Sequence, residues 1–245
     1  RKFFGTLYNT YSFFALYANI DGFTGREAEI PVSERPEIDR WILSELNSLI
    51  RDVTASLEDY DPTPAARRID QFVDENLSNW YVRLSRKRFW GGELTADKLA
   101  AYQALYTCLE TVVMLAAPIA PFITDRIFCD LNAISGRHTE SSVHLAEYPT
   151  SNAELIDSQL ETMMSLAQRA SSMVLALRRK VNIKVRQPLQ KIIIPVLDKA
   201  MAAHIEKVRG LIMGEVNVKD IELISDTTGI ITKRIKLNFK AFCQR

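Results

Sequence analysis

The chain is poor in the residues that build metal sites and disulfide frameworks. Its 245 residues include three cysteines, Cys108, Cys129 and Cys243. They are far apart and odd in number, which predicts neither a disulfide frame nor a Cys-x-x-Cys metal site. The histidines are also few, and they lack the spacing of metal ligands: His138, His144 and His204. We therefore expect no metal site and a reducing, cytoplasmic environment.

Long apolar runs are scarce as well. The longest covers residues 112–123, and Pro118 and Pro121 interrupt it. A run this short does not span a bilayer, and residues 1–6 lack the apolar core and cleavage site of a signal peptide. We expect no membrane partner. Both ends of the sequence read as cuts through a longer protein.

The motifs of phosphate-binding loops and of hydrolase active sites are missing too. The sequence contains no Gly-x-x-x-x-Gly-Lys, Gly-x-Gly-x-x-Gly, His-Glu-x-x-His or Gly-x-Ser-x-Gly motif. The acidic residues Asp52, Glu58, Asp59 and Asp61 are typical of a solvated helix end. The sequence therefore predicts no catalytic and no cofactor-binding residue in this chain, and it favours a binding module.

Overall charge gives no general attraction to nucleic acid, because 31 Lys and Arg face 30 Asp and Glu. Residues 79–90 are an exception, with the sequence NWYVRLSRKRFW and no acid between Glu75 and Glu93. Cations neutralise phosphates, and flat rings stack on bases, so this mixture suits a nucleic acid. The alternative is a helix end with buried rings and solvated cations.

A second acid-free cluster covers residues 178–191 and holds six cations. Lys184 and Arg186 are two residues apart, so on a strand they project from the same face. This cluster is either a phosphate-binding surface or the solvated outer face of a sheet.

The first half of the chain has the periodicity of helices. We expect them at residues 2–20, from Pro36 to about 59, at 64–90, from 95 to about 116 and at 122–131. Thr63 and Thr95 are expected to cap the third and fourth helices, with Pro64 in the first helical position of the third. Long amphipathic helices with short connections predict a mainly α fold, an antiparallel helical bundle.

The character of the sequence changes after residue 132. A turn-rich strap covers residues 135–154, in which Leu145 and Tyr148 are expected to pack on the bundle. A helix at 157–180 precedes β-rich runs at 181–185, 189–196, 216–224 and 230–239, with a helix at 199–212. This pattern predicts a small α+β domain. The predicted domains are a bundle at 1–134, the strap at 135–154 and the α+β domain at 155–245.

Several segments together resemble one family. Residues 79–90, 117–122 and 142–149 are similar to the anticodon-binding helical domain of class I aminoacyl-tRNA synthetases for isoleucine, valine and leucine. Further segments narrow the resemblance to isoleucyl-tRNA synthetases: 9–14, 17–21, 183–189, 215–219 and 238–240. The last three resemble the branch shared by eukaryotes, archaea and some bacteria. The chain departs from that pattern at residues 241–243, where the family usually has a residue and then Leu-Gly.

This resemblance, which covers essentially all 245 residues, implies an enzyme that joins isoleucine to tRNA(Ile) with ATP and Mg²⁺. Its catalytic and editing domains would precede Arg1 in the same polypeptide. The His-Ile-Gly-His and Lys-Met-Ser-Lys-Ser motifs of the catalytic domain are absent here. The chain alone is therefore expected to be inactive and to hold no cofactor, with tRNA(Ile) and the missing domains as its partners.

The resemblance also favours a role for the two basic clusters in binding the tRNA backbone. The expected tRNA-binding residues are Arg83, Arg86, Lys87, Arg179, Lys180, Lys184, Arg186 and Lys191. Arg88 is expected to pair with an acid or pack on an aromatic ring, and Trp80 and Phe89 are expected in the core. Two alternatives stay open: a helical scaffold that binds a protein through the aromatic helix 2–20, and the equivalent region of valyl-tRNA synthetase.

Overall fold

The computed structural model describes residues 2–196 and 198–225. The chain divides into two compact units, of which the first ends at Glu161 and the second begins at Thr162. The described helices and the two strands confirm the predicted fold class, a helical bundle followed by a small α+β part. The limits predicted for the domains and for the strap between them stay predictions.

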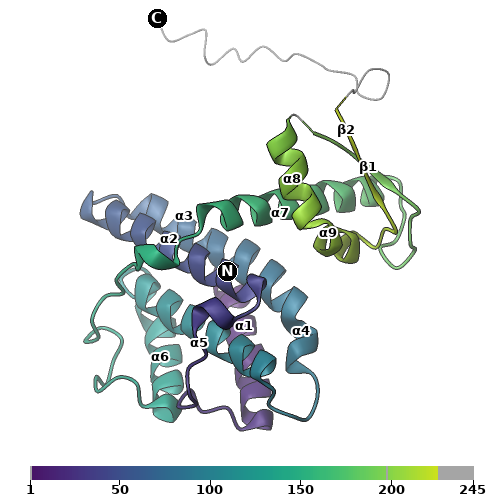
Figure 1. Ribbon diagram of the computed structural model, residues 1–245. Helices are drawn as coiled ribbons and strands as arrows, with labels where there is room; N and C mark the ends of the chain where they lie inside the picture. Colours follow the sequence, from purple (N-terminus) through teal and green to yellow (C-terminus); the bar gives the residue numbers. More distant parts are fainter. Residues whose placement is uncertain (1, 197, 226–245) are drawn as a thin grey trace, which may run out of the picture. The chain divides into compact units, whose positions relative to one another are not determined.

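The first unit is a bundle of helices (Figure 1), joined by short connections except for the longer loop at residues 22–36 between α1 and α2. Two 3-10 turns, Val32–Glu34 and Ala153–Leu155, lie in its connections. Its longer helical elements are α1 (Lys2–Asp21), α2 (Glu37–Glu58), α3 (Pro62–Gln71), η2 (Phe72–Val82), α4 (Arg83–Phe89), α5 (Ala96–Ala116) and α6 (Pro121–Ser135).

Helix α5 forms the centre of this bundle, where it contacts α1, α2, α3, α4 and α6. Side chains on all of its sides are fully buried, among them Tyr102, Leu105 and Val112. Among the described helices, α5 has the length and the apolar composition of a membrane span, but 72% of that stretch is buried inside the protein. A helix that is apolar all round is what the core of a bundle requires.

The predicted helix at 64–90 is one continuous helical run, but it is divided into α3, η2 and α4. Its middle section, η2, is wound as a π-helix, which apolar periodicity does not predict. The run also begins earlier than expected, because Asp61 caps it by accepting a hydrogen bond from the Thr63 backbone N–H at 3.2 Å. Pro62 then takes the first helical position. The cap at Thr95 is confirmed, with a bond of 3.2 Å from Lys98 N–H.

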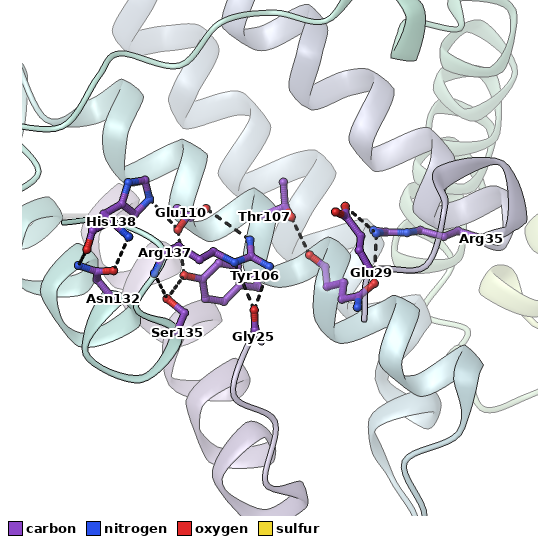
Figure 2. Close-up of polar contacts among 11 residues, drawn as sticks. Gly25, Glu29, Arg35, Tyr106, Thr107, Glu110, Asn132, Ser135, Arg137 and His138 are labelled. Atoms are coloured by element: carbon purple, nitrogen blue, oxygen red, sulfur yellow. Dashed lines mark hydrogen bonds and ion pairs between the residues drawn. The ribbon is translucent and has the colours of Figure 1, made fainter. Parts of the chain in front are cut away.

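A polar cluster joins the loop after α1 to the middle of α5 and to the end of α6 (Figure 2). The Tyr106 hydroxyl contacts Ser135 Oγ at 2.7 Å and donates to Glu110 at 2.9 Å. The guanidinium of Arg137 lies 4.3 Å above the Tyr106 ring and donates to the Gly25 carbonyl at 3.2 Å. The hydroxyl of Tyr106 and one face of its ring are thereby both used in this cluster.

The strap is attached to the bundle through other residues than expected. Leu145 is 68% exposed, so the expectation that it packs on the bundle was wrong, whereas Tyr148 is 39% exposed and partial burial raises its pKa. Val143 is buried instead, and Asp125 accepts hydrogen bonds from Ser142 Oγ at 2.7 Å and from Val143 N–H at 2.9 Å. These bonds lower the pKa of the Asp125 carboxyl. Hydrogen bonds to an ionised acid hold the strap where apolar contact was expected.

The second unit contains the rest of α7 (Ser158–Lys180), two strands and two helices. Strand β1 (Ile192–Pro195) pairs in parallel with β2 (Ile221–Ile224), with Ile192 opposite Ile221. Parallel neighbours need a crossover connection, and α8 (Lys199–Lys207) and α9 (Arg209–Val216) supply it. The predicted run at 230–239 lies outside the described residues.

The strand predicted at 181–185 is a turn, and this prediction was wrong. Asn182 has φ 56° and ends α7, while Ile183 N–H donates to the Arg178 carbonyl at 2.9 Å and Asn182 N–H to the Arg179 carbonyl at 3.2 Å. This pair of bonds closes a helix end through a left-handed residue, a conformation that asparagine tolerates better than most residues.

Glu45 on α2 provides a test of the packing around the start of α7. Burial, followed by the nearby Glu161 carboxylate, raises its pKa to about 7. A raised folded-state pKa contributes stability that is fully present below the unfolded value and is lost as pH rises through 7. We predict that Glu45→Gln, which mimics the neutral form, raises the free energy of unfolding at pH 8 by roughly 1 kcal/mol and changes it little near pH 4.

Urea unfolding at several pH values measures this difference. Glu147→Gln is the control, because Glu147 is exposed, and it should show no such pH dependence. An equal effect of Glu45→Gln at pH 4 and pH 8 would contradict the assignment of the raised pKa to Glu45.

Candidate nucleic-acid interface

The first basic cluster lies on α4, the last section of the long helical run. Arg83, Arg86 and Lys87 are all exposed. Arg83 and Lys87 are four residues apart and so share a face of the helix, and no acid lies within α4. Cations in the last turn also interact favourably with the helix dipole. The structure therefore presents three of the predicted tRNA-binding residues together on one short helix.

An exposed aromatic side chain ends this cluster. Trp90 follows α4 in an extended conformation and is 56% exposed. Gly91 comes next with φ 118°, a conformation that suits glycine and turns the chain away from the helix. Trp80 and Phe89 are buried, which confirms the prediction that they belong to the core. The segment thus offers one ring to solvent beside its cations.

Arg88 is the cation of this segment that does not face solvent. Its guanidinium donates to both carboxylate oxygens of Asp39 at 2.6 and 2.8 Å, and to Asp97 at 3.0 Å. Of the two alternatives predicted for Arg88, the structure therefore shows the pairing with an acid. Burial opposes its charge, but the hydrogen bonds to Asp39 outweigh that effect and raise the pKa of Arg88.

Asp39 is fully buried, and it also accepts a hydrogen bond from the Tyr81 hydroxyl at 2.8 Å. Burial, together with the nearby Asp39 carboxylate, raises the pKa of Tyr81, which therefore stays a donor. Asp39 comes from α2 and Asp97 from α5, so Arg88 fastens α4 to both helices. The ion pair fixes the helix from which the exposed cations project.

The second cluster is organised around an arginine that is almost fully buried. Arg178 donates to the carbonyl oxygens of Lys184 at 3.2 Å, Gln187 at 3.0 Å and Asn217 at 2.9 Å. These bonds draw the turn at 181–187 against the chain that follows α9. Sequence reasoning counted Arg178 among the cations of the run and missed this structural role, because only the fold brings the three carbonyls together.

The other predicted residues of this cluster are exposed: Arg179, Lys180, Lys184, Arg186 and Lys191. Lys184 and Arg186 lie in the turn, so the argument that a strand places them on one face does not hold. Lys191 forms an ion pair with Glu222, and this hydrogen bond raises the pKa of Lys191. Its charge is therefore partly neutralised, which leaves the other four cations of this cluster as the stronger candidates for binding phosphate.

Acidic, histidine and cysteine side chains do not gather into a metal site in the part of the chain that the structure describes. Cys108 is buried on α5, and burial raises the pKa of its thiol. A thiol kept neutral is a poor nucleophile and a poor metal ligand. The candidate interface therefore rests on cations and one exposed ring.

The sequence was compared with models of known protein families, and one of them matches most of the chain. Residues 39–193 match the family described as the anticodon-binding domain of tRNA ligase. This range contains the Asp39–Arg88 ion pair, the whole of α4 and the whole of the second basic cluster. The chain belongs to this family.

Among curated proteins, similar relatives are named isoleucine–tRNA ligases. The protein of Bacteroides thetaiotaomicron is 63% identical over 98% of this chain, and that of Cytophaga hutchinsonii is 59% identical over 98%. The Dehalococcoides mccartyi (strain CBDB1) protein is 47% identical over 89%. The chain spans about a fifth of the length of these relatives. They do not favour the two alternatives, a protein-binding scaffold or a valyl-tRNA synthetase.

The Asp39–Arg88 pair leads to a prediction about stability. Asp39→Asn should lower the free energy of unfolding by about 3 kcal/mol, because it removes the bidentate, buried partner of a largely buried guanidinium and leaves only the exposed Asp97 beside it. Arg86→Ala, which removes an exposed cation two residues away from Arg88, should change it by less than about 0.5 kcal/mol. Urea unfolding of both variants at pH 7 measures the difference. Equal stability of the two variants would show that the ion pair does not hold α4.

Proposed function

We propose that this chain is the tRNA-binding part of an isoleucyl-tRNA synthetase and that its ligand is tRNA(Ile). The observation that carries this proposal is the exposed, acid-free cation cluster on α4 within a domain of the anticodon-binding family. The names of the relatives support isoleucine as the amino acid. Their bacterial origin does not support the eukaryotic and archaeal-like branch, which stays a prediction.

In this proposal the cations bind the backbone of the RNA. Arg83, Arg86 and Lys87 contact phosphates on the first unit, and Arg179, Lys180, Lys184, Arg186 and Lys191 do so on the second. Phosphate contacts position the RNA without reading its sequence. Trp90 adds a flat ring on which an unpaired base stacks, the usual way in which proteins hold single-stranded RNA.

The chemistry belongs to the rest of the polypeptide. The complete synthetase would use ATP and Mg²⁺ to activate isoleucine in a catalytic domain and would carry an editing domain, both outside this chain. We place it in the cytoplasm and expect no membrane partner. The role of this chain is to hold the tRNA while those domains act on its acceptor end.

Removing two cations from α4 tests the backbone contacts. If roughly four phosphates are neutralised, the affinity of the complete enzyme for tRNA(Ile) should fall with a log–log salt slope of about −3. The double variant Arg83→Ala with Lys87→Ala should reduce this slope by about one to two units and weaken all tRNAs similarly. Filter binding at several salt concentrations measures the slope.

The matched control is Arg126→Ala with Lys207→Ala, which also removes one arginine and one lysine. Both residues are exposed and lie outside the two basic clusters. The control should leave the slope within the error of the wild type. Equal salt slopes in both double variants would show that the α4 cluster is a solvated surface that does not contact the tRNA backbone.

The proposal that the chemistry takes place in other domains leads to a second prediction. This chain alone should show no isoleucine-dependent exchange between ATP and pyrophosphate, because it has no phosphate-cradling motif. The polypeptide encoded by the complete gene should catalyse that exchange. Exchange by the isolated chain, at a rate that scales with its concentration in a pure preparation, would overturn the proposal.

A further inference from the structure

The outward face of α1 is apolar to an unusual degree for a surface helix. Four large apolar side chains on this helix are strongly exposed: Phe4 at 46%, Tyr8 at 57%, Leu16 at 57% and Ile20 at 68%. Phe4 and Tyr8 are four residues apart, as are Leu16 and Ile20, so each pair lies together on the helix surface. Clustered exposed apolar side chains mark interaction sites, whereas single ones do not.

The same helix carries no charge between Lys2 and Asp21. Its inner side is already used by the bundle, since Leu7, Phe14 and Ala18 are buried. Its end is fastened to α5 by the buried ion pair between Asp21 and Lys98 at 2.5 Å. The exposed side chains therefore belong to a helix that the bundle holds in place, and its outward face is a preformed surface.

A pocket of about 300 Å³ lies at the first turn of this helix. It is lined mostly by apolar side chains: Phe3, Ala66, Arg67, Ile69, Asp70, Ala116, Ile119 and Ala120. The Phe3 ring in its wall packs edge-on against the exposed ring of Phe4, with centroids 5.5 Å apart. A pocket beside exposed aromatic rings is the arrangement that receives an anchoring side chain in protein interfaces.

The outward face of α1 lacks the charges that a nucleic acid would need as its ligand. A phosphate backbone requires cations, and α1 has none between its two ends, in contrast to α4. An apolar protein surface is the partner whose chemistry fits. The relatives extend over about five times the length of this chain, so in a protein of their size most of the polypeptide lies outside it and is available as that partner.

We propose that the outward face of α1 and the adjoining pocket form the docking surface for another part of the same, longer polypeptide. This inference rests on the proposed function, which makes the chain one domain of a complete synthetase. Docking through a rigid apolar face fixes the tRNA-binding domain relative to the domains that carry out the chemistry. The contact buries surface that would otherwise favour aggregation of the free domain.

Thiol labelling tests the coverage of this face directly. Ile20→Cys and Leu145→Cys place single reporters at two sites of equal exposure, 68% each, of which only Ile20 lies on the proposed surface. The background carries Cys129→Ser and Cys243→Ser, because Cys108 is buried. In the isolated chain both reporters should react with a maleimide at similar rates.

In the complete polypeptide the reporter at position 20 should react with the maleimide at least about tenfold more slowly than in the isolated chain. The reporter at position 145 should keep its rate. Tyr8→Cys, at the other end of the helix, should be protected in the same way. Equal rates at positions 20 and 145 in the complete polypeptide would overturn the inference. Concentration-dependent protection in the isolated chain would also overturn it, in favour of a second copy as the occupant.

The proposed function fails separately from this inference. If the complete gene encodes no additional domains, or its product lacks isoleucine-dependent pyrophosphate exchange, the proposed function is wrong before any labelling is compared. If the exchange is present but position 20 stays accessible, the docking surface alone is wrong.

Discussion

The bidentate pair between Arg88 and Asp39 is the interaction on which the surface of the first unit depends. Asp39 is fully buried on α2, and an ionised carboxylate in that position requires a partner. Arg88 supplies it at 2.6 and 2.8 Å and reaches Asp97 on α5 as well. The requirement fixes α4 against two helices of the core. The exposed cations on α4 therefore have a defined direction.

The basic cluster of the second unit resembles that of the first, because one of its cations is buried and the others are exposed. Arg178 is the buried member, and its guanidinium holds three carbonyl oxygens that close the turn after α7. Its neighbours in the sequence face solvent. A chain with a net charge of +1 has no general attraction to RNA. In the proposed function that attraction comes from two local clusters, each organised by one arginine that is used for structure.

The sequence predicted the helices and the fold class well, because apolar periodicity reports directly on which residues are buried. For Arg88 it offered two alternatives, an acid or an aromatic ring, and the structure shows the acid. It did not predict the π-helical section at 72–82 or the positive φ of Asn182, which depend on backbone hydrogen bonding rather than on pattern. For Leu145, local hydrophobicity was misleading because hydrogen bonds to Asp125 anchor the strap. The predicted cations of the interface are exposed, but exposure alone does not identify their ligand.

The most direct measurement of the central claim is photo-crosslinking of tRNA(Ile) to the complete enzyme. A benzoylphenylalanine at Trp90 lies beside the α4 cations, whereas the same residue at Tyr60, which is 94% exposed, lies among Glu58, Asp59 and Asp61. The account predicts a crosslink to tRNA from position 90, lost at high salt, and none from position 60. Crosslinking from position 60 but not from position 90 would contradict it.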